Sequence, residues 1–362
     1  MAKRLCRTAF LFMLAAMFMP ATGRATERRK VIIDQDCAGP GGTDMQSIAL
    51  LLQSPEVEVL GITVVSGDAW RDEEVAHALR LLEIMGRTDV PVMPGAVFPL
   101  INRKEETARW EKLYGKIPYQ GAWNWGKIHG PFEVPELPEG KPTTKASAED
   151  AAHFLIRMVH AYPHQVTIYE GGPMTDLALA CAIDPQFAAL ARELVFMGGS
   201  LSPVSDDPEF ATAPRREFNM QWDPEAAHIV LRSLWAKITC TTLDVSLQTR
   251  LTKDMIGDLG RTPMPLAQYL AKYDQEGYLW DELAAAAWLD PSLITSQRTL
   301  LMDVDIDHGA GYGNTLVWNP GGGPGLGEQA VHAQIDVDKA RFYRLFLDLT
   351  TRATPRAATR GN

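Results

Sequence analysis

Short apolar runs rich in β-branched residues alternate with stretches of helical spacing along most of this 362-residue chain. The runs typical of buried strands are 31–33, 57–65, 90–93, 166–169, 194–197, 238–242 and 331–336. The stretches with helical spacing are 48–52, 73–85, 148–162, 174–182, 224–234, 265–289 and 339–350. This alternation predicts a doubly wound α/β fold, in which helices flank a mainly parallel central sheet on both faces.

Composition is that of a globular protein, with 46% hydrophobic and 22% charged residues. We predict one domain over residues 26–355 and a flexible tail at 356–362. Residues 100–146 carry five Trp and Tyr side chains among Gly and Pro with little periodicity, which predicts an aromatic loop insertion or lid. The formal net charge of −10 argues against a nucleic-acid polymer as partner.

The first 25 residues have the pattern of a secretory signal peptide. Lys3, Arg4 and Arg7 precede an apolar run at 8–19, which Pro20 ends. This predicts a periplasmic or secreted protein that has no membrane contact after cleavage; an uncleaved N-terminal anchor is the alternative. The three cysteines that remain, Cys37, Cys181 and Cys240, do not form a disulfide framework.

A glycine-rich loop with three acids follows the first strand. Asp34, Asp36 and Asp44 lie at the carboxyl end of a buried strand, which is where parallel sheets place their sites. Crowded carboxylates repel one another, and a hard cation such as calcium or magnesium relieves that repulsion. The alternative is an acidic turn in which Asp44 caps a helix. A phosphate-binding loop is disfavoured, because the segment has no Gly-Lys-Ser/Thr.

Two further segments carry candidate polar ligands. Asp281 starts an apolar helical run, where it would serve as a metal ligand or, more commonly, as a helix N-cap. Glu217 and Asn219 are two apart, so in an extended segment their side chains point the same way. Side chains of these types bind sugar hydroxyls.

Taken in order, these segments resemble the inosine-uridine nucleoside hydrolase family over about residues 30–350. Its opening pattern, Asp-x-Asp-Pro-Gly-x-Asp-Asp, is similar to the loop that contains Asp36 and Asp44. The other matching segments are Ser54-Pro55-Glu56, Leu60-Gly61-Ile62-Thr63, Gly172-Pro173-Met174-Thr175-Asp176-Leu177-Ala178, Met197-Gly198-Gly199, Glu217-Phe218-Asn219, Asp223-Pro224-Glu225-Ala226-Ala227 and the helix from Asp281 to Asp290-Pro291.

The resemblance implies calcium-dependent hydrolysis of the N-glycosidic bond of a nucleoside, a small-molecule substrate. It implies that Asp36, Asp44, Asp281 and the main-chain carbonyl of Thr175 hold one Ca²⁺, and that Asp36 is the general base. It also implies that three side chains bind the ribose: Asp68, Glu217 and Asn219. Family members are commonly dimers or tetramers, so a homo-oligomer is expected.

Several positions depart from the family pattern. The loop between Asp36 and Asp44 is longer, Thr43 replaces an acid that binds ribose, and Ala211 falls where an Asn is usual. Two alternatives therefore remain open: a hydrolase of the same fold that acts on a different riboside or glycoside, and a non-catalytic exported protein that binds nucleosides or sugars.

Trp280 is the change that bears on the base. Inosine-uridine-preferring members have a His before the last metal acid, whereas this Trp-Asp pair resembles the purine-preferring branch. We therefore predict a preference for purine nucleosides, with Trp280 stacked on the base and Trp123 or Trp125 on its second face. Core packing is the alternative for Trp280, and an amphipathic lid or interface is the alternative for the other two. His129 would be a leaving-group acid or a solvated loop residue.

Overall fold

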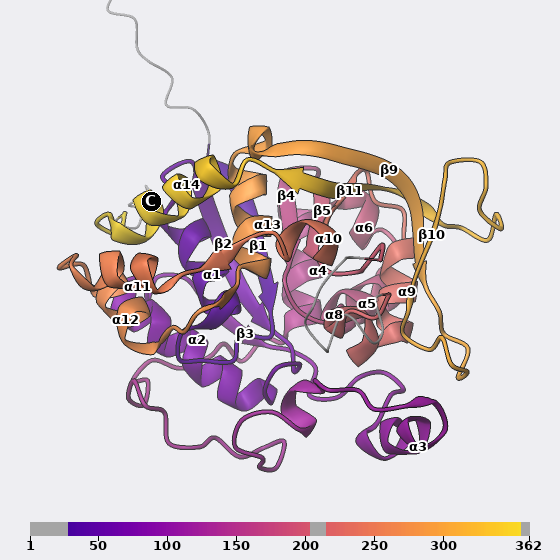
Figure 1. Cartoon of the computed structure of the whole chain (residues 1–362), viewed down its shortest axis with the longest axis horizontal. Helices are drawn as coiled ribbons and strands as arrows, with labels where there is room; N and C mark the ends of the chain where they lie inside the picture. Colours follow the sequence, from indigo (N-terminus) through magenta and orange to yellow (C-terminus); the bar gives the residue numbers. More distant parts are fainter. Residues whose placement is uncertain (1–27, 203–214, 356–362) are drawn as a thin grey trace, which may run out of the picture.

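The computed structural model describes residues 28–202 and 215–355, and helices cover both faces of a central sheet (Figure 1). Within these residues the main sheet has nine strands: β1 (Arg29–Gln35), β2 (Val57–Val64), β3 (Val92–Pro94), β4 (Val166–Glu170), β5 (Glu193–Met197), β6 (Ile238–Thr241), β9 (Ile294–Val304), β10 (Thr315–Trp318) and β11 (Gln329–Val337). Their order is β10-β9-β11-β6-β5-β4-β1-β2-β3. All pairings in this described sheet are parallel except the two that β9 makes, with β10 and with β11, and this confirms the predicted α/β fold class.

Two hydrophobic cores lie on opposite faces of the sheet. The helices packed in the first core are α1 (Gly42–Gln53), α2 (Arg71–Met85), α11 (Lys253–Gly260), α12 (Pro265–Tyr273), α13 (Trp280–Leu289) and α14 (Lys339–Thr351). The helices packed in the second are α4 (Ala151–Ala161), α5 (Thr175–Ile183), α6 (Phe187–Leu190) and α9 (Pro224–Arg232). Because both faces are covered, the inner strands β1, β4 and β5 are buried along almost their whole length.

The first strand shows this double burial residue by residue. Val31 and Ile33 pack in the first core, and Ile32 between them packs in the second. All three side chains are fully buried. Successive side chains of a strand point to opposite faces, so a run of three β-branched residues suits a strand between two helical layers.

The position of β1 in the sheet decides where a site can form. It pairs in parallel with β2 on one side and with β4 on the other, so the chain winds away from it in both directions. Loops that leave the carboxyl ends of such neighbouring strands separate and open a crevice between them.

Three sequence predictions differ from the structure. The helix predicted over 265–289 is interrupted: α12 ends at Tyr273, the short strand β8 (Gly277–Tyr278) pairs with β7 (Arg250–Leu251), and α13 begins at Trp280. The insertion predicted as a loop contains α3 (Lys104–Tyr114) and the 3₁₀ turn η1 (Gly121–Trp123). The antiparallel strands β9 and β10 were not predicted, because the first half of β9 is largely exposed and lacks an apolar pattern.

The remaining predictions about the chain ends are not addressed by the fold. The predicted signal peptide at 1–25 and the tail at 356–362 lie outside the described residues. In the part of the chain that is described, no helix combines the length and the apolar character that a bilayer crossing requires.

Candidate functional site

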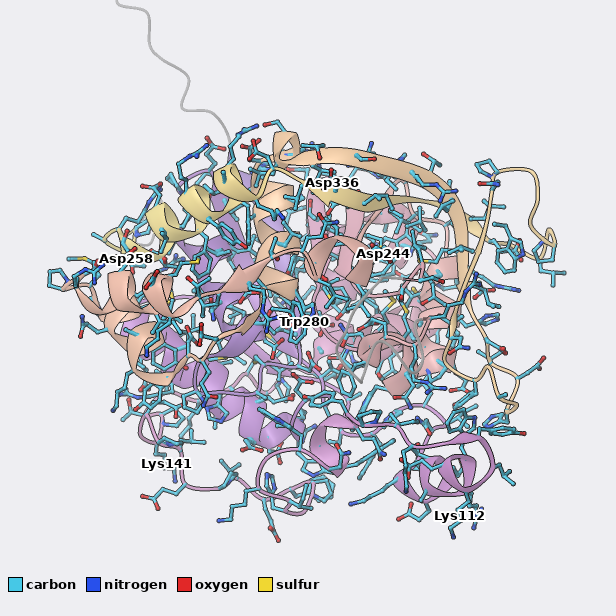
Figure 2. The ribbon with its side chains drawn as sticks, in the orientation of Figure 1. Lys112, Lys141, Asp244, Asp258, Trp280 and Asp336 are labelled. Carbon is cyan, nitrogen blue, oxygen red and sulfur yellow. The ribbon has the colours of Figure 1, made fainter. Side chains whose placement is uncertain are left out.

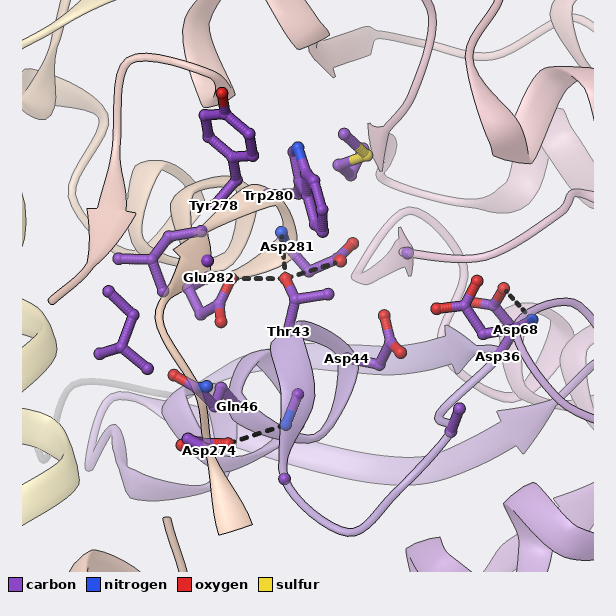
Figure 3. Close-up of a pocket in the computed structure, with 18 of the residues that line it drawn as sticks. Asp36, Thr43, Asp44, Gln46, Asp68, Asp274, Tyr278, Trp280, Asp281 and Glu282 are labelled. Atoms are coloured by element: carbon purple, nitrogen blue, oxygen red, sulfur yellow. Dashed lines mark hydrogen bonds between the residues drawn. The ribbon is translucent and has the colours of Figure 1, made fainter. Parts of the chain in front are cut away.

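A cavity of about 440 Å³ opens at the carboxyl ends of the central strands (Figure 3). Each of four neighbouring strands contributes lining residues at or just beyond its end: Asp36 after β1, Asp68 after β2, Gly171 after β4 and Met197 at the end of β5. The segment from Tyr273 through Glu282, which contains the break between α12 and α13, lines the opposite side. The interruption of the predicted helix therefore forms one wall of this site.

The long loop between β1 and α1 is fastened to that opposite wall. The Gly41 amide donates to the Tyr269 hydroxyl at 2.9 Å, and the Gly42 amide donates to Asp274 Oδ1 at 2.8 Å. Gly41 has φ +74°, and a side chain there would meet Asp274. Glycine is therefore required where the loop crosses this wall.

Four acids of the cavity are buried close to one another. The exposed fractions of Asp36, Asp44 and Asp281 are 2%, 4% and 3%. Burial raises the pKa of Asp36 and of Asp44 well above the usual range, and neighbouring carboxylates raise both further, Asp68 foremost. Burial likewise raises the pKa of Asp68 to about 6 and that of Asp281 to about 7. A cluster of carboxylates buried in this way is stabilised when its members bind protons or share a cation.

The donor chemistry of these acids fits a hard divalent cation. Their ligand atoms are all oxygen, and Asp281 Oδ1 is buried without a hydrogen-bond partner among the described residues. Within residues 28–202 and 215–355, no three His, Cys, Asp or Glu side chains are drawn together closely enough to enclose a metal ion. Mutual repulsion of carboxylates opposes such convergence until a cation is bound.

The structure does not bring Thr175 to this cluster. Thr175 begins α5, its hydroxyl donates to Asp223 Oδ2 at 2.7 Å, and it does not line the cavity. The main-chain position that does line the cavity on this strand is Gly171, whose carbonyl accepts from Asn219 Nδ2 at 2.8 Å. β4 ends at Glu170, five residues before Thr175, so the structure places Gly171 and not Thr175 at the edge of the cavity.

The three predicted sugar-binding residues all line the cavity. Glu217 caps α8 (Phe218–Trp222) and accepts from the amides of Gly199, Asn219 and Met220. Asn219 is held by donation from its Nδ2 to the carbonyls of Gly171 and Met197. Asp68 accepts from the Tyr119 hydroxyl at 2.7 Å. These hydrogen bonds fix the side chains before any ligand arrives.

Thr43 occupies the centre of the cavity floor (Figure 3). Its hydroxyl lies 2.5 Å from Glu282 Oε2 and 3.1 Å from Asp281 Oδ2, and it accepts from the Asp281 amide at 3.1 Å. The sequence analysis missed Glu282 as a site residue, although it directly follows the candidate metal acid. It also missed Gln46, Asp274 and Tyr119, which line the cavity without belonging to any of the matching segments.

The predicted aromatic residues divide into two groups. Trp280 and Trp125 line the cavity, and Tyr278 lies beside Trp280 with ring centroids 5.6 Å apart. Trp123 does not line it: its side chain is buried and stacks on Trp222 with centroids 4.3 Å apart. Of the two candidates for the second face, Trp125 is the one that lines the cavity, because η1 turns the Trp123 side chain into a small core beneath the insertion.

Two other residues of interest lie away from the cavity. His129 Nε2 hydrogen-bonds Glu73 Oε2 at 2.7 Å, and this pairing fastens the insertion to α2. Its position therefore contradicts a role as leaving-group acid, since it does not line the cavity. Cys37 is a buried free thiol that hydrogen-bonds the Glu74 carbonyl. Ala211 lies outside the described residues.

Known proteins share this fold and sequence along nearly the whole chain. The family model described as inosine-uridine preferring nucleoside hydrolase matches residues 31–344. Uridine nucleosidase 1 of Arabidopsis thaliana is 30% identical over 331 residues, which cover 86% of this chain and 90% of that protein. The inosine-uridine preferring nucleoside hydrolase of Leishmania major is 28% identical over 340 residues, which cover 90% and 98%. The solved purine-preferring ribonucleoside hydrolase from Gardnerella vaginalis matches with a TM-score of 0.70 and 26% identity, over 89% of this chain and 98% of that one.

Replacing Trp123 and replacing Trp125 should affect different properties, the first stability and the second substrate binding. Trp123→Ala leaves a cavity against Trp222, so the free energy of unfolding should fall by roughly 3–5 kcal/mol. Trp125 is 52% exposed, so Trp125→Ala should change stability by less than about 1 kcal/mol. Because Trp125 lines the cavity, the same variant should raise the KM for a nucleoside. Urea unfolding and steady-state kinetics of both variants test this; equal KM values for Trp125→Ala and wild type would contradict it.

Asp274 should make stability depend on pH. Burial raises its pKa to about 7, so the native state holds the proton more tightly than the unfolded state does. Its stabilising contribution is complete below the unfolded pKa of about 4 and is lost as the pH rises through about 7. From pH 5 to pH 8, in chelator, Asp274→Asn should therefore gain on the order of 1–3 kcal/mol relative to wild type. Urea unfolding at both pH values measures the difference, and exposed Asp254→Asn, which should show none, is the control.

Proposed function

This chain belongs to the inosine-uridine preferring nucleoside hydrolase family and is a nucleoside hydrolase acting on ribonucleosides, and we propose that it works with Ca²⁺ and prefers purine nucleosides. The observation that carries the proposal is the gathering of Asp36, Asp44 and Asp281 beside Trp280 in one cavity. This combination joins a candidate metal and water site to a flat aromatic surface for a base.

The acids and one main-chain carbonyl would hold the cation. These four residues line the same cavity: Asp36 follows β1, Asp44 lies in α1, Gly171 follows β4 and Asp281 lies in α13. A cation there supplies Lewis-acid activation of the attacking water. Calcium is favoured over softer metals by the all-oxygen donors, which include a carbonyl.

Asp36 is the residue suited to take the proton of the attacking water. One of its oxygens, Oδ2, accepts from the Asp68 amide at 3.1 Å, which fixes the carboxylate in the cavity floor. Glu217, Asn219 and Asp68 would hold the ribose hydroxyls and orient C1′ toward the water. A ring of carboxylates also stabilises the positive charge that develops on the sugar in an oxocarbenium-like transition state.

The purine preference rests on the aromatic wall. Trp280 and Tyr278 offer extended faces for a two-ring base, and a cavity of about 440 Å³ has room for one. The named relatives include both a uridine nucleosidase and a purine-preferring hydrolase, so the wall and not the family supports this preference. Hydrolysis of a different riboside is motivated by Thr43, which lines the cavity where family members carry an acid. Ala211, the other substituted position, lies outside the described residues. Membership of a hydrolase family sets aside the non-catalytic binding protein.

Base release from five nucleosides tests the proposal directly. With Ca²⁺, the protein should release base from inosine, adenosine and guanosine with a kcat/KM roughly tenfold or more above that for uridine and cytidine. A chelator should abolish release from all five, because water activation is lost. Faster release from uridine would contradict the purine preference, and full activity in chelator would contradict the metal.

Asp36→Asn serves as the mechanistic variant in the same assay. Its kcat should fall by roughly 10²–10⁴-fold, since the general base and one ligand are removed together. Asp254→Asn, an exposed acid changed in the same way, should retain wild-type kcat. Thermal unfolding verifies that both variants are folded, and unchanged turnover in Asp36→Asn would overturn the role of Asp36.

Export to the periplasm or outside the cell is supported by the basic, apolar and small-residue pattern of residues 1–25. If the segment is cleaved after Ala25, N-terminal sequencing of the protein from its native compartment should begin at Thr26. A sequence that begins at Met1 would support the uncleaved anchor instead. A homo-oligomer stays a prediction of the family resemblance.

A further inference from the structure

The cavity is lined by many more carboxyl groups than one divalent cation can bind. Eight carboxyl groups line it: Asp36, Asp44, Asp68, Glu217, Asp274, Glu276, Asp281 and Glu282. Three of them are the candidate ligands of a divalent ion, which leaves the other five without a charge partner in the cavity. Among the described lining residues there is no Lys, Arg or His. Residues 203–214, which lie outside the description, contain none of the three in their sequence either.

The two lysines that Figure 2 labels, and the arginine next to the site in sequence, lie away from the cavity lining. Figure 2 places Trp280 near the middle of the molecule, whereas Lys112 and Lys141 lie on the insertion at its lower edge. Arg216 is close to the site in sequence, but its guanidinium stacks on Trp110 at 4.5 Å from the ring centroid. The cavity therefore presents a negative potential to a ligand, with low-dielectric walls that strengthen it.

Aromatic rings form much of the remaining wall. Tyr119, Trp125 and Phe218 lie on the side of the insertion and α8, and the Tyr119 and Phe218 rings meet edge to face at 4.9 Å. Tyr273, Tyr278 and Trp280 lie on the opposite side, along the linker between α12 and α13. Aromatic faces attract cations through their quadrupole, and the attraction is larger where water is excluded. Acids and rings together make a cage suited to a flat cation.

Buried acceptors in the cavity have no donor to bind. Gln46 Oε1, Asp274 Oδ2 and Glu282 Oε1 are buried and lack a hydrogen-bond partner in the described structure. Gln46 is 2% exposed and Glu282 is 0% exposed. Figure 3 shows Gln46 and Asp274 next to each other on the floor, with Glu282 above them. Unsatisfied acceptors in such a place favour a ligand that brings positive charge or N–H donors.

The chemistry of bond cleavage also favours a ligand with a positively charged ring. A neutral base leaves as an anion unless a donor protonates it, and two tyrosine hydroxyls of this cavity are already engaged. The Tyr119 hydroxyl donates to Asp68, and the Tyr273 hydroxyl donates to the Pro138 carbonyl. A base with a fixed positive charge on the ring needs no proton in order to leave.

We propose that this cavity selects ribosides whose base carries a fixed positive charge, namely N-ribosylpyridinium compounds and N7-alkylated purine nucleosides, over ribosides of neutral or anionic bases. The inference rests on the proposed function, hydrolysis of an N-ribosidic bond in this cavity. Water attacks C1′ while the C1′–N bond breaks, and the electron pair of that bond neutralises the ring cation. The water proton passes to Asp36 and then to solvent. The products are ribose, a neutral base and one proton.

Two pyridinium ribosides separate charge from leaving-group chemistry. Nicotinamide riboside and nicotinic acid riboside share the ring and the glycosidic bond, but the second carries a carboxylate that the acidic cavity repels. The kcat/KM for nicotinamide riboside should exceed that for nicotinic acid riboside by about tenfold or more at low salt. The ratio should shrink as ionic strength rises.

A purine pair extends the test to the two-ring bases. For 7-methylguanosine and guanosine, each kcat/KM is divided by the rate of uncatalysed hydrolysis of that compound at the same pH. The corrected value for 7-methylguanosine should be about tenfold larger. This correction removes the intrinsic lability of the methylated compound, so the remaining ratio reports what the cavity contributes.

Charge-neutral variants locate the source of the preference. At pH 8.5, above the pKa of about 7 to which burial raises Asp274, Asp274→Asn and Glu276→Gln remove one negative charge each from the cavity and keep the side-chain shape. Each should reduce the nicotinamide riboside to nicotinic acid riboside ratio about threefold, and the double variant should reduce it further. Exposed Asp254→Asn alters the net charge of the protein equally but lies outside the cavity, so it should leave the ratio unchanged.

The outcomes distinguish this inference from the function on which it rests. Release of hypoxanthine and guanine from inosine and guanosine, with both charge ratios near one, would overturn the inference and leave the proposed function standing. No base release from any neutral or cationic riboside by folded, calcium-loaded protein would overturn both. Release from the cationic ribosides alone would support the inference and remove the purine preference.

Discussion

Burial of several carboxylates at one edge of a parallel sheet is the constraint on which the rest of this structure depends. Asp36, Asp44, Asp68 and Asp281 come from segments far apart in the chain, and each is raised in pKa chiefly by its own burial. Such a cluster persists only because two apolar cores hold the strands rigidly beneath it. Glycine allows the close approach: a Cβ at Gly67 would lie 2.0 Å from Asp36 Oδ2, and one at Gly172 would also meet Asp36.

The walls around these acids come from connections and not from the sheet. The loop before α1 is fastened to Tyr269 and Asp274, and Thr43 is joined to Asp281 and Glu282. The insertion contributes Tyr119 and Trp125 from the other side, while Trp123 anchors it on Trp222. Each connection thus has residues that anchor it to the rest of the protein and others that face the cavity. This anchoring holds the walls in place although they lie outside regular strands.

Sequence patterns predicted the sheet well because its inner strands are buried on both faces. The Val31-Ile32-Ile33 run, and the acid that follows it, fixed both a strand and the position of a site. The break at Asp274–Leu279 was missed because apolar residues resume at 280–289, although the polar run Asp274-Gln275-Glu276-Gly277 is typical of a turn; the contact of Asp274 with Gly42 fixes that turn in the structure. Thr175 and Trp123 were misplaced for a related reason. A motif or a composition identifies a segment. It does not tell which residue of that segment faces the cavity, because that depends on where the strand ends and how the η1 turn directs its side chains.

The division between sheet and walls explains how one family includes members named for uridine and for purines. In the proposed mechanism, the acids at the strand ends would perform the part of the reaction that every nucleoside shares, which is attack at C1′ of the sugar. The base would lie against residues whose positions are set by connections, such as Trp280 and Tyr278, and a connection can change without disturbing the cores. The departures of this chain, namely the longer loop, Thr43 and Trp280, all lie in those connections or at the helix ends that adjoin them. Gln46, Asp274 and Glu282 line the cavity next to these departures, so a change in the same connections alters the electrostatic potential of the cavity together with the surface offered to the base.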